Sequence, residues 1–512
     1  MFEGWCKRNV ANLTEARQAG VDVTLFSGIL TQPFNCSEMP VKIIQSCSIA
    51  LFSVGLVACA SVPSTTTSNS ASAPAAEHAS PFDSTYTIPS APAYVLSGAT
   101  VLTGSGEQLD DASVVFADGK IIAVGNQIDV PEGAVSIDAR GKWITPGIID
   151  VHSHMGVYPN PSVESHSDGN EMVAPATAKV WAEHSVWPQD PNFEKALAGG
   201  VTTAQILPGS ANLFGGRGVT LKTVPSVTMM GMKFPDAPHA LKMACGENPK
   251  RVYGEKGGPG TRMGNMAGYR SAWIAAKSYD KLWDEYEAKV ANGDKSAQAP
   301  ERNLEMETLR GVLDGEIKIH NHCYRADEMA NMIELSKEFG YKIAAFHHAV
   351  EAYKVAPLLA ENDICAVVWA DWWGFKQEAY DMIRENAALI EYAKGCAIIH
   401  SDDETQIQRL PQEVGKVVSA AKQIGIDIPV ATAIKWLTSN SAKSIGLDDR
   451  IGSLAPGMNA DVVLWSGNPL SVYSKADKVW VDGALRFDRD NANVNTTSDF
   501  NLGIIAPTED RP

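Results

Sequence analysis

The sequence has little of what defines several large protein classes. Its 512 residues include only 8 cysteines and no Cys-x-x-Cys pair, which argues against a zinc ribbon or a dithiol redox motif. Lys and Arg (43) are outnumbered by Asp and Glu (60), and the net charge of −17 disfavours nucleic acid and anionic membranes as main partners. No internal repeat is evident, which disfavours a solenoid or propeller. Charged residues make up only 20% of the chain, so most of it is expected to be globular.

The cysteines give no disulfide pattern. Four of them precede residue 60, and the other four, Cys245, Cys323, Cys365 and Cys396, are single and widely separated. Two disulfides would be possible in an oxidising compartment, but the spacing does not specify them. We therefore interpret these four cysteines as buried free thiols.

The chain contains no apolar run long enough for a typical membrane-spanning helix. The longest, at 43–58, has 16 residues; it follows Lys42 and ends in Leu56-Val57-Ala58-Cys59. Read from Met39, which we take as the true start in place of Met1, this pattern predicts a secretory signal. Its ending resembles the bacterial lipobox, whose cysteine becomes lipid-modified. We thus expect residues 1–59 to be an upstream extension and signal, and the protein to be exported, either periplasmic or anchored to the outer membrane only through Cys59.

The next segments predict a tether and a small β domain. Residues 60–85 are rich in Ser, Thr, Ala and Pro and predict a flexible tether. Short β-rich runs with an Asp118-Gly119 hairpin signal occupy 86–145, and similar runs occupy 447–490. We expect both ends to form one small β-sandwich, followed by a tail at 491–512.

Residues 146–446 alternate apolar strand-like runs with segments of helical periodicity. Strands are predicted at 201–207, 343–346, 364–368 and 396–399, and helices at 326–339 and 412–424. This alternation over about 300 residues predicts parallel βα units, and the length suits a (β/α)8 TIM barrel. In such barrels the functional residues follow the carboxyl ends of the strands.

Histidines and a carboxylate follow four of these apolar runs. Six of the 11 histidines lie in three such places, and Asp402 lies in a fourth; the histidines are His152, His154, His320, His322, His347 and His348. Residues i and i+2 of a strand face the same side, so His152 and His154 can point at one ion. Imidazole and carboxylate are common ligands of divalent zinc, and Asp402 could also accept a proton from water. The pattern predicts a metal site.

A lysine and a polar run suggest further ligands. Lys242 lies inside an apolar run, where an unpaired ammonium is costly, so it must be paired, deprotonated or chemically modified. Glu247 could bridge metals or pair with Lys250 or Arg251. Arg217 and Arg262, in glycine-containing turns, are hypothesised to hold a substrate carboxylate. The Asp371-Trp372-Trp373 segment fits either an aromatic pocket wall or a buried Trp pair.

These residues match a family pattern. Residues 146–154 (Pro-Gly-Ile-Ile-Asp-Val-His-Ser-His) resemble the signature of the metal-dependent amidohydrolase superfamily, and residues 452–463 resemble its closing β-sandwich segment. Gly200-Val201-Thr202-Thr203 lies between them in the expected order. The resemblance covers about residues 93–490 and is to the imidazolonepropionase-like and prolidase-like groups.

The resemblance implies a metal-activated water that hydrolyses a C–N bond of a small molecule. It implies one or two divalent metals, most often zinc, with either Lys242, carboxylated, or Glu247 as a bridge. Asp402 would be ligand and general base, and His322 would contact the substrate; the other implied ligands are His152, His154, His320 and His348. A prolidase-like dipeptidase or N-acyl-amino-acid hydrolase, a lactonase or esterase, and a non-catalytic binding protein are the alternatives. A homo-oligomer is possible.

Overall fold

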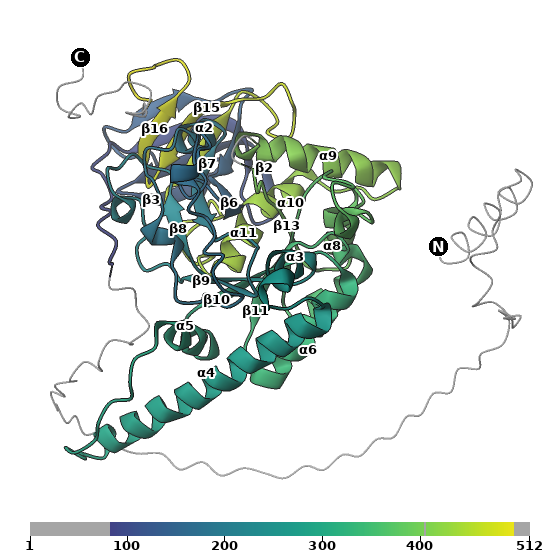
Figure 1. Ribbon diagram of the computed structural model, residues 1–512. Coiled ribbons are helices and arrows are strands. Elements are labelled where there is room, and N and C mark those ends of the chain that lie inside the picture. Colours follow the sequence, from purple (N-terminus) through teal and green to yellow (C-terminus); the bar gives the residue numbers. More distant parts are fainter. Residues whose placement is uncertain (1–81, 404–405, 496–512) are drawn as a thin grey trace, which may run out of the picture. The chain divides into compact units, whose positions relative to one another are not determined.

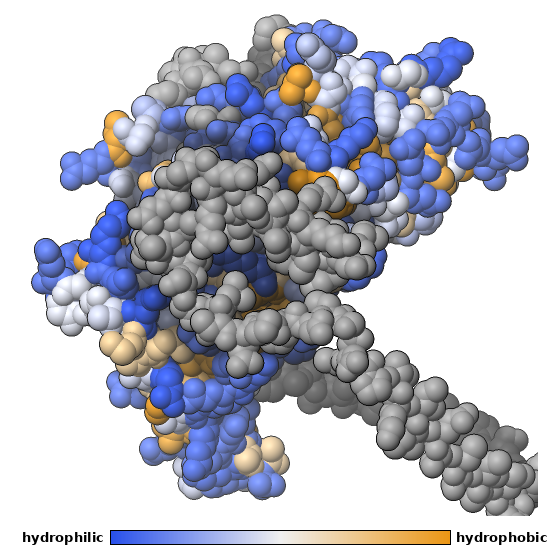
Figure 2. All heavy atoms as spheres, turned by 90° about the vertical axis from the view of Figure 1, so that its right-hand side faces the viewer, coloured by the Kyte–Doolittle hydropathy of each residue, from blue (hydrophilic) through white to orange (hydrophobic). Residues whose placement is uncertain are grey.

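The computed structural model describes residues 82–403 and 406–495. The predicted signal, the predicted anchor residue Cys59 and most of the predicted tether lie outside the described residues, as do both candidate start residues and the end of the tail. Among the described residues, no helix combines the length and the apolar character that crossing a membrane requires. Hydrophilic residues dominate the described part of the face in Figure 2, where hydrophobic residues form small separate patches.

An eight-stranded, nearly closed barrel occupies the middle of the chain (Figure 1). Its strands pair in sequence order: β6 (Ile148–Ser153), β7 (Val201–Ile206), β8 (Phe214–Lys222), β9 (Ala240–Ala244), β10 (Lys318–Cys323), β11 (Ile343–His348), β12 (Cys365–Val368) and β13 (Cys396–Ile399). Apolar side chains in β6 to β13 are almost entirely buried, which explains why these strands are near-continuous apolar runs in the sequence.

One strand departs from the expected eightfold parallel arrangement. β8 runs antiparallel to both β7 and β9, whereas the other neighbouring strands pair in parallel. Only residues 207–213 connect β7 to β8, and a connection this short cannot make the crossover that a parallel strand requires. The expectation of eight parallel βα units was therefore wrong at this strand.

Helices connect most of the parallel strands, as the apolar periodicity predicted. They are α2 (Asn192–Ala198), α3 (Glu247–Tyr253), α4 (Arg262–Ala291), α5 (Leu304–Leu313), α6 (Ala326–Phe339), α7 (Ala356–Glu361), α8 (Asn386–Tyr392), α9 (Leu410–Gln423), α10 (Val430–Ile434) and α11 (Ser439–Ser444). α6 has the predicted bounds and ends at Gly340, whose φ of 79° gives the left-handed cap that glycine adopts without strain. α9 begins two residues before its predicted start.

The two ends of the described chain form one eight-stranded sheet. The amino-terminal strands are β1 (Tyr94–Leu102), β2 (Gln108–Ala117), β3 (Lys120–Gly125), β4 (Val135–Asp138) and β5 (Trp143–Pro146); the carboxyl-terminal ones are β14 (Val462–Trp465), β15 (Ala476–Val481) and β16 (Ala484–Asp488). They meet where β5 pairs with β14, in the order β16-β15-β14-β5-β1-β2-β3, with β4 on β1. Both ends of the chain therefore contribute strands to one hydrogen-bonded sheet.

This sheet curls around its own core. Trp480 of β15 contacts Phe116 of β2 at 5.6 Å between ring centroids and Tyr94 of β1 at 5.5 Å, although β15 and β2 lie four places apart in the strand order. Such contacts require the sheet to fold over itself. A sandwich of two separate sheets stays a prediction, because the strands form one hydrogen-bonded path.

The four cysteines of the folded region form two disulfides, so the interpretation as free thiols was wrong. Cys245, directly after β9, pairs with Cys323 at the end of β10, and Cys365 pairs with Cys396 at the starts of β12 and β13. The partners are 78 and 31 residues apart in the chain, yet they lie on neighbouring strands with Cα–Cα distances of 5.2 and 4.5 Å. Strand pairing, which the spacing of the cysteines does not reveal, brings them together.

Candidate metal centre

The strand β6 places two histidines at the mouth of the barrel. It follows the tight junction at Gly147, where a Cβ atom would lie 2.0 Å from Thr202 Oγ1, so only glycine fits. His152 Nε2 and His154 Nε2 lie 3.2 and 3.1 Å from Asp402 Oδ1. His154 Nδ1 lies 2.8 Å from the Leu207 carbonyl oxygen, to which it donates, and this leaves Nε2 as the nitrogen with a free lone pair.

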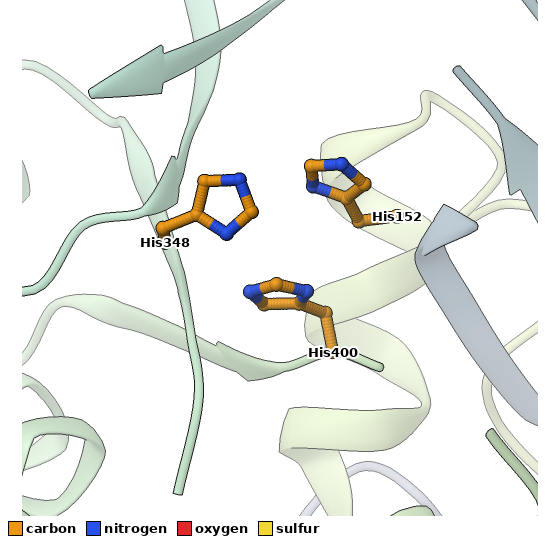
Figure 3. A group of neighbouring side chains, drawn as sticks. All are labelled: His152, His348 and His400. Carbon is orange, nitrogen blue, oxygen red and sulfur yellow. The ribbon is translucent and has the colours of Figure 1, made fainter. Parts of the chain in front are cut away.

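His348, at the end of β11, and His400, directly after β13, face His152 (Figure 3). One ring nitrogen of each of these three histidines lies within 4.8 Å of the others, and the same holds for ligand atoms of His152, His154 and Asp402. His348 and Asp402 have φ of 66° and 54°, a left-handed conformation that is uncommon for residues other than glycine. Backbone strain of this kind clusters at functional sites, and here it occurs at two members of the cluster.

The donor set fits a divalent cation. Both ring nitrogens of His400 and Nδ1 of His348 are buried without a hydrogen-bond partner among the described residues. Burial lowers the pKa of His400 to about 3 and that of His348 well below its ordinary value, so both rings are neutral. Neutral imidazoles with free lone pairs beside a carboxylate are the form in which these residues ligate metals. The buried orphan nitrogens would otherwise cost free energy.

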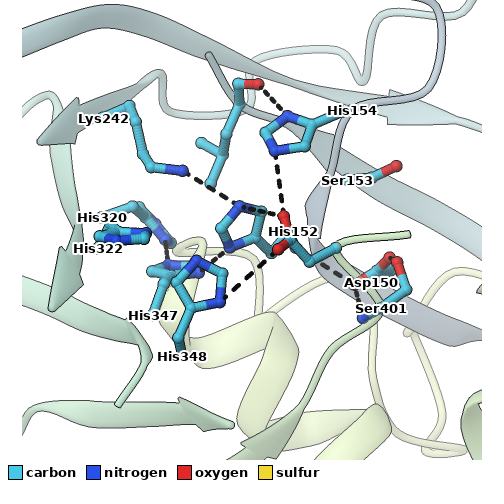
Figure 4. A network of polar contacts seen from close by, with 12 residues as sticks. Asp150, His152, Ser153, His154, Lys242, His320, His322, His347, His348 and Ser401 are labelled. Atoms are coloured by element: carbon cyan, nitrogen blue, oxygen red, sulfur yellow. Dashed lines mark hydrogen bonds and ion pairs between the residues drawn. The ribbon is translucent and has the colours of Figure 1, made fainter. Parts of the chain in front are cut away.

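A second layer of polar residues lies beneath these ligands (Figure 4). Lys242 Nζ lies 3.1 Å from His152 Nε2, and burial lowers the pKa of this lysine to about 7. His347 bridges its neighbours, with Nδ1 2.9 Å from His152 Nδ1 and Nε2 2.8 Å from His320 Nδ1. His320 is therefore held through His347, and its Nε2 has no hydrogen-bond partner among the described residues.

Asp150 ties β6 to the loop that carries Asp402. Its carboxylate accepts hydrogen bonds from the backbone N–H groups of His152 and Ser401 and from the Ser401 hydroxyl, and the Asp402 N–H donates to the His152 carbonyl at 3.1 Å. Burial raises the pKa of Asp150 to about 7. Burial alone would also raise the pKa of Asp402, but its close contact with His154 and its position beside His400 and Lys242 outweigh burial and lower this pKa.

A cavity of about 550 Å³ opens onto this cluster. His154, His348 and Asp402 form its floor, and His322, the predicted substrate contact, lines it beside Asn248 at 3.3 Å. Its wall residues are Tyr158, Asn170, Gly209, Ser210, Glu247, Asn248, Arg251, Tyr324, Trp369, Trp372, Phe375 and Lys376. The volume suits a small-molecule substrate.

The structure separates the two residues considered as a metal bridge. Lys242 lies against His152, whereas Glu247 lies at the start of α3 on the cavity wall, 3.5 Å from Lys376 Nζ. Glu247 belongs to neither group of ligand atoms within 4.8 Å among the described residues. Of the two, only Lys242 is therefore in contact with the ligand cluster.

The two predicted arginines lie away from the cavity. Arg217 is buried on β8, where its Nε donates to Thr308 Oγ1 and its guanidinium lies 4.2 Å above the Trp181 ring. The antiparallel course of β8 means that its carboxyl end points away from the barrel mouth. Arg262, at the start of α4, donates to Asp327 at 2.9 Å and lines a separate pocket of about 270 Å³. The geometry gives neither arginine the position that binding a substrate carboxylate here requires.

The sequence reasoning missed His400 and the cations of the cavity. His400 directly follows the apolar run at 396–399, so the strand-end rule that identified the other histidines applies to it equally. Arg251 and Lys376 line the cavity, but they lie on α3 and on the loop after β12, and no spacing in the sequence indicates that these segments face each other. Of the two adjacent tryptophans, only Trp372 lines the cavity.

Known proteins resemble this chain in sequence and in structure. A sequence model of the amidohydrolase family matches residues 404–487. The crystal structure of an amidohydrolase from Thermotoga maritima is 35% identical, covers 77% of this chain and 100% of that one, and superposes with a TM-score of 0.69. The amidohydrolase tasK of Hapsidospora irregularis is 33% identical to this chain over 395 residues. The aligned region covers 73% of this chain but only 40% of tasK, so this chain spans less than half the length of that relative. An imidazolonepropionase of Mesorhizobium japonicum is 22% identical over 70% of this chain and 87% of its own.

Proposed function

The chain belongs to the amidohydrolase superfamily, whose members hydrolyse C–N bonds, and from this premise we propose that it uses a bound divalent metal to hydrolyse an amide bond of a small molecule. The observation that carries the proposal is the convergence of neutral, unpartnered imidazole nitrogens and one carboxylate at the cavity, where His348 and Asp402 line it and His400 lies buried within the same cluster. Zinc is the cation we favour, because nitrogen and carboxylate ligands suit it.

The residues that would hold the metal are those of the two overlapping groups, which share His152. His154 and Asp402 complete one group, and His348 and His400 complete the other. Carboxylation of the Lys242 amine would create a further ligand directly beside His152, and the low pKa of this lysine supports that modification, because only the neutral amine reacts with carbon dioxide. One cation requires one of these groups.

The chemistry divides among the side chains that face the cavity. A divalent cation at this site supplies a Lewis acid and activates water at neutral pH. Asp402, ionised and at the cavity floor, is placed to accept the proton of that water and to pass it to the leaving nitrogen. His322, whose Nε2 lies 3.3 Å from Asn248 Nδ2, is placed to polarise the substrate carbonyl or orient its amide.

Among C–N substrates we propose an N-acyl amino acid or a dipeptide. The cavity wall carries both Arg251 and Lys376, cations that can hold a carboxylate, and Glu247, which can hold an amino group. A lactone or simple ester would use the same catalytic groups but would have no need of these charges.

We also propose that the protein is exported. Two disulfides in a chain of this size support an oxidising compartment, because cytosolic proteins are normally kept reduced. The predicted signal and the Cys59 anchor, which lie outside the described residues, are consistent with the same location.

Elemental analysis of the purified protein tests the metal. We expect one or two equivalents of zinc in the wild type and their loss in a His152→Ala/His154→Ala variant, while His184→Ala, at a half-exposed histidine outside the cluster, keeps them. A screen of N-acyl amino acids and dipeptides on the same samples tests the reaction. Absence of metal after reconstitution with zinc would refute the proposed mechanism.

A further inference from the structure

A continuous stack of aromatic rings leads from the candidate metal ligand His348 to the cavity mouth. The Trp369 ring stacks on His348 with 4.2 Å between centroids, and Trp372 stacks on Trp369 at 5.0 Å with an interplanar angle of 8°. Phe375 meets both tryptophans edge-on, at 5.6 and 6.2 Å. All three rings come from the segment after β12 and line the same cavity as Asp402.

The outer rings of this stack are open to solvent. Phe375 is 55% exposed and Trp372 is partly exposed, whereas Trp369 is buried beside His348. Large apolar side chains exposed at the mouth of a cavity indicate a ligand that covers them, because leaving them in water forgoes the free energy of burial. The rings therefore offer a flat apolar surface at a fixed distance from the candidate catalytic residues.

Another part of the cavity wall is polar and charged. Arg251 of α3 makes no ion pair within 4 Å among the described residues and donates only weakly, over 3.4 Å, to Asn248 Oδ1. Lys376, by contrast, lies 3.5 Å from Glu247 and 4.0 Å above the Tyr324 ring. Arg251 is thus the cation available to an incoming carboxylate.

We propose that Trp372 and Phe375 form a subsite that binds an aromatic or bulky apolar side chain of the substrate, while Arg251 holds the carboxylate of the same molecule. This inference rests on the proposed function in naming the substrate: an N-acyl amino acid or dipeptide with an aromatic or large apolar residue. The scissile amide then lies between the ring stack and Asp402, and substrates with a glycine residue leave the subsite empty.

The chain contains a matched control for this subsite. Trp373, the next residue, is 59% exposed and packs at 5.3 Å against Tyr380, and it does not line the cavity. Replacing Trp372 or Trp373 removes the same chemical group from adjacent positions of one loop. Only Trp372 and Phe375 should affect a ligand in the cavity.

Binding of two non-hydrolysable probes tests the subsite independently of catalysis. 2-Benzylsuccinate and succinate share two carboxylates and differ only by the benzyl group, and isothermal titration of the purified zinc-loaded protein measures both. We expect 2-benzylsuccinate to bind at least about tenfold more tightly, as an aromatic group in a fitting pocket does. Trp372→Ala and Phe375→Ala should each remove most of this preference without changing the succinate affinity, and Trp373→Ala should keep it.

Each other outcome contradicts the proposal. Equal affinity for the two probes refutes the subsite, and so does the absence of measurable binding of either probe at millimolar concentration. The subsite is also refuted if Trp372→Ala and Trp373→Ala reduce the preference for 2-benzylsuccinate equally. Near-UV circular dichroism checks that Trp372→Ala is folded, and Phe375→Ala, at a more exposed position, provides the second reading. If the protein prefers the benzyl probe but hydrolyses no amide, the subsite stands and the proposed function is refuted. If it hydrolyses amides without preferring the benzyl probe, the proposed function stands and the subsite is refuted.

Discussion

The disulfide between Cys245 and Cys323 should matter to the metal site, whereas the second disulfide should not. It joins the carboxyl ends of β9 and β10, the strands that carry Lys242, His320 and His322, and the Cys245 N–H donates to the His322 carbonyl at 2.8 Å. The second disulfide joins the amino ends of β12 and β13, at the opposite end of the barrel. The perturbation is Cys245→Ala/Cys323→Ala, and Cys365→Ala/Cys396→Ala is its control.

The stability loss expected for the two variants is nearly the same. Chain-entropy arguments give about 4.5 kcal/mol for closing the loop of 78 residues and about 3.7 kcal/mol for the loop of 31, a difference of about 0.8 kcal/mol. Both values fall within the range of roughly 2–5 kcal/mol found when native disulfides are removed. Stability alone therefore does not distinguish the variants, but their positions do.

Urea unfolding and zinc content of the same samples make the comparison. We expect both double variants to lose similar stability, and only Cys245→Ala/Cys323→Ala to bind zinc more weakly, by about tenfold or more, because residues that orient metal ligands act at this scale. Equal zinc affinity in the two variants, whether both weakened or both unchanged, would refute the idea that the mouth disulfide orients the ligand-bearing strands.

Three further predictions concern single groups. Asp402→Asn removes the proposed proton acceptor and should lower kcat by about 100-fold or more. Steady-state kinetics measures this effect, far-UV circular dichroism checks that the variant is folded, and an unchanged kcat would exclude the role. Removal of the metal with a chelator should abolish activity and lower Tm, and added zinc should restore both, because a ligand of the native state stabilises it; a Tm that ignores both treatments would contradict the metal site. Burial raises the pKa of Glu328 from its ordinary 4.5 to about 7, so the native state binds this proton more tightly than the unfolded chain does. Stability is therefore lost as the pH rises, by about 2–3 kcal/mol between pH 5 and pH 8. Glu328→Gln should lack this loss in urea unfolding at pH 5 and pH 8, and an equal pH dependence of both proteins would contradict the assignment.

Local sequence patterns were enough to predict most of the elements and most of the candidate ligands. Apolar runs fix the buried strands, and the residues that follow them must lie at the barrel mouth because parallel strands share one carboxyl edge; this is how His152, His154, His348 and Asp402 could be named together. Helical periodicity gave α6 its bounds, and Asp118-Gly119, with positive φ at both residues, gave the hairpin between β2 and β3. Each of these signals is local, acting within one strand, helix or turn.

Contacts between groups that are distant in the sequence could not be predicted and follow from the packing of the barrel. The antiparallel course of β8 moved Arg217 away from the cavity, strand pairing joined cysteines 78 and 31 residues apart, and the register of β9 placed Lys242 rather than Glu247 beside His152. The cavity likewise brings the ring stack of the loop after β12 together with charged residues of α3. Such contacts depend on strand direction, register and loop path, which are set by the packing of the whole barrel and leave no periodic trace in the chain.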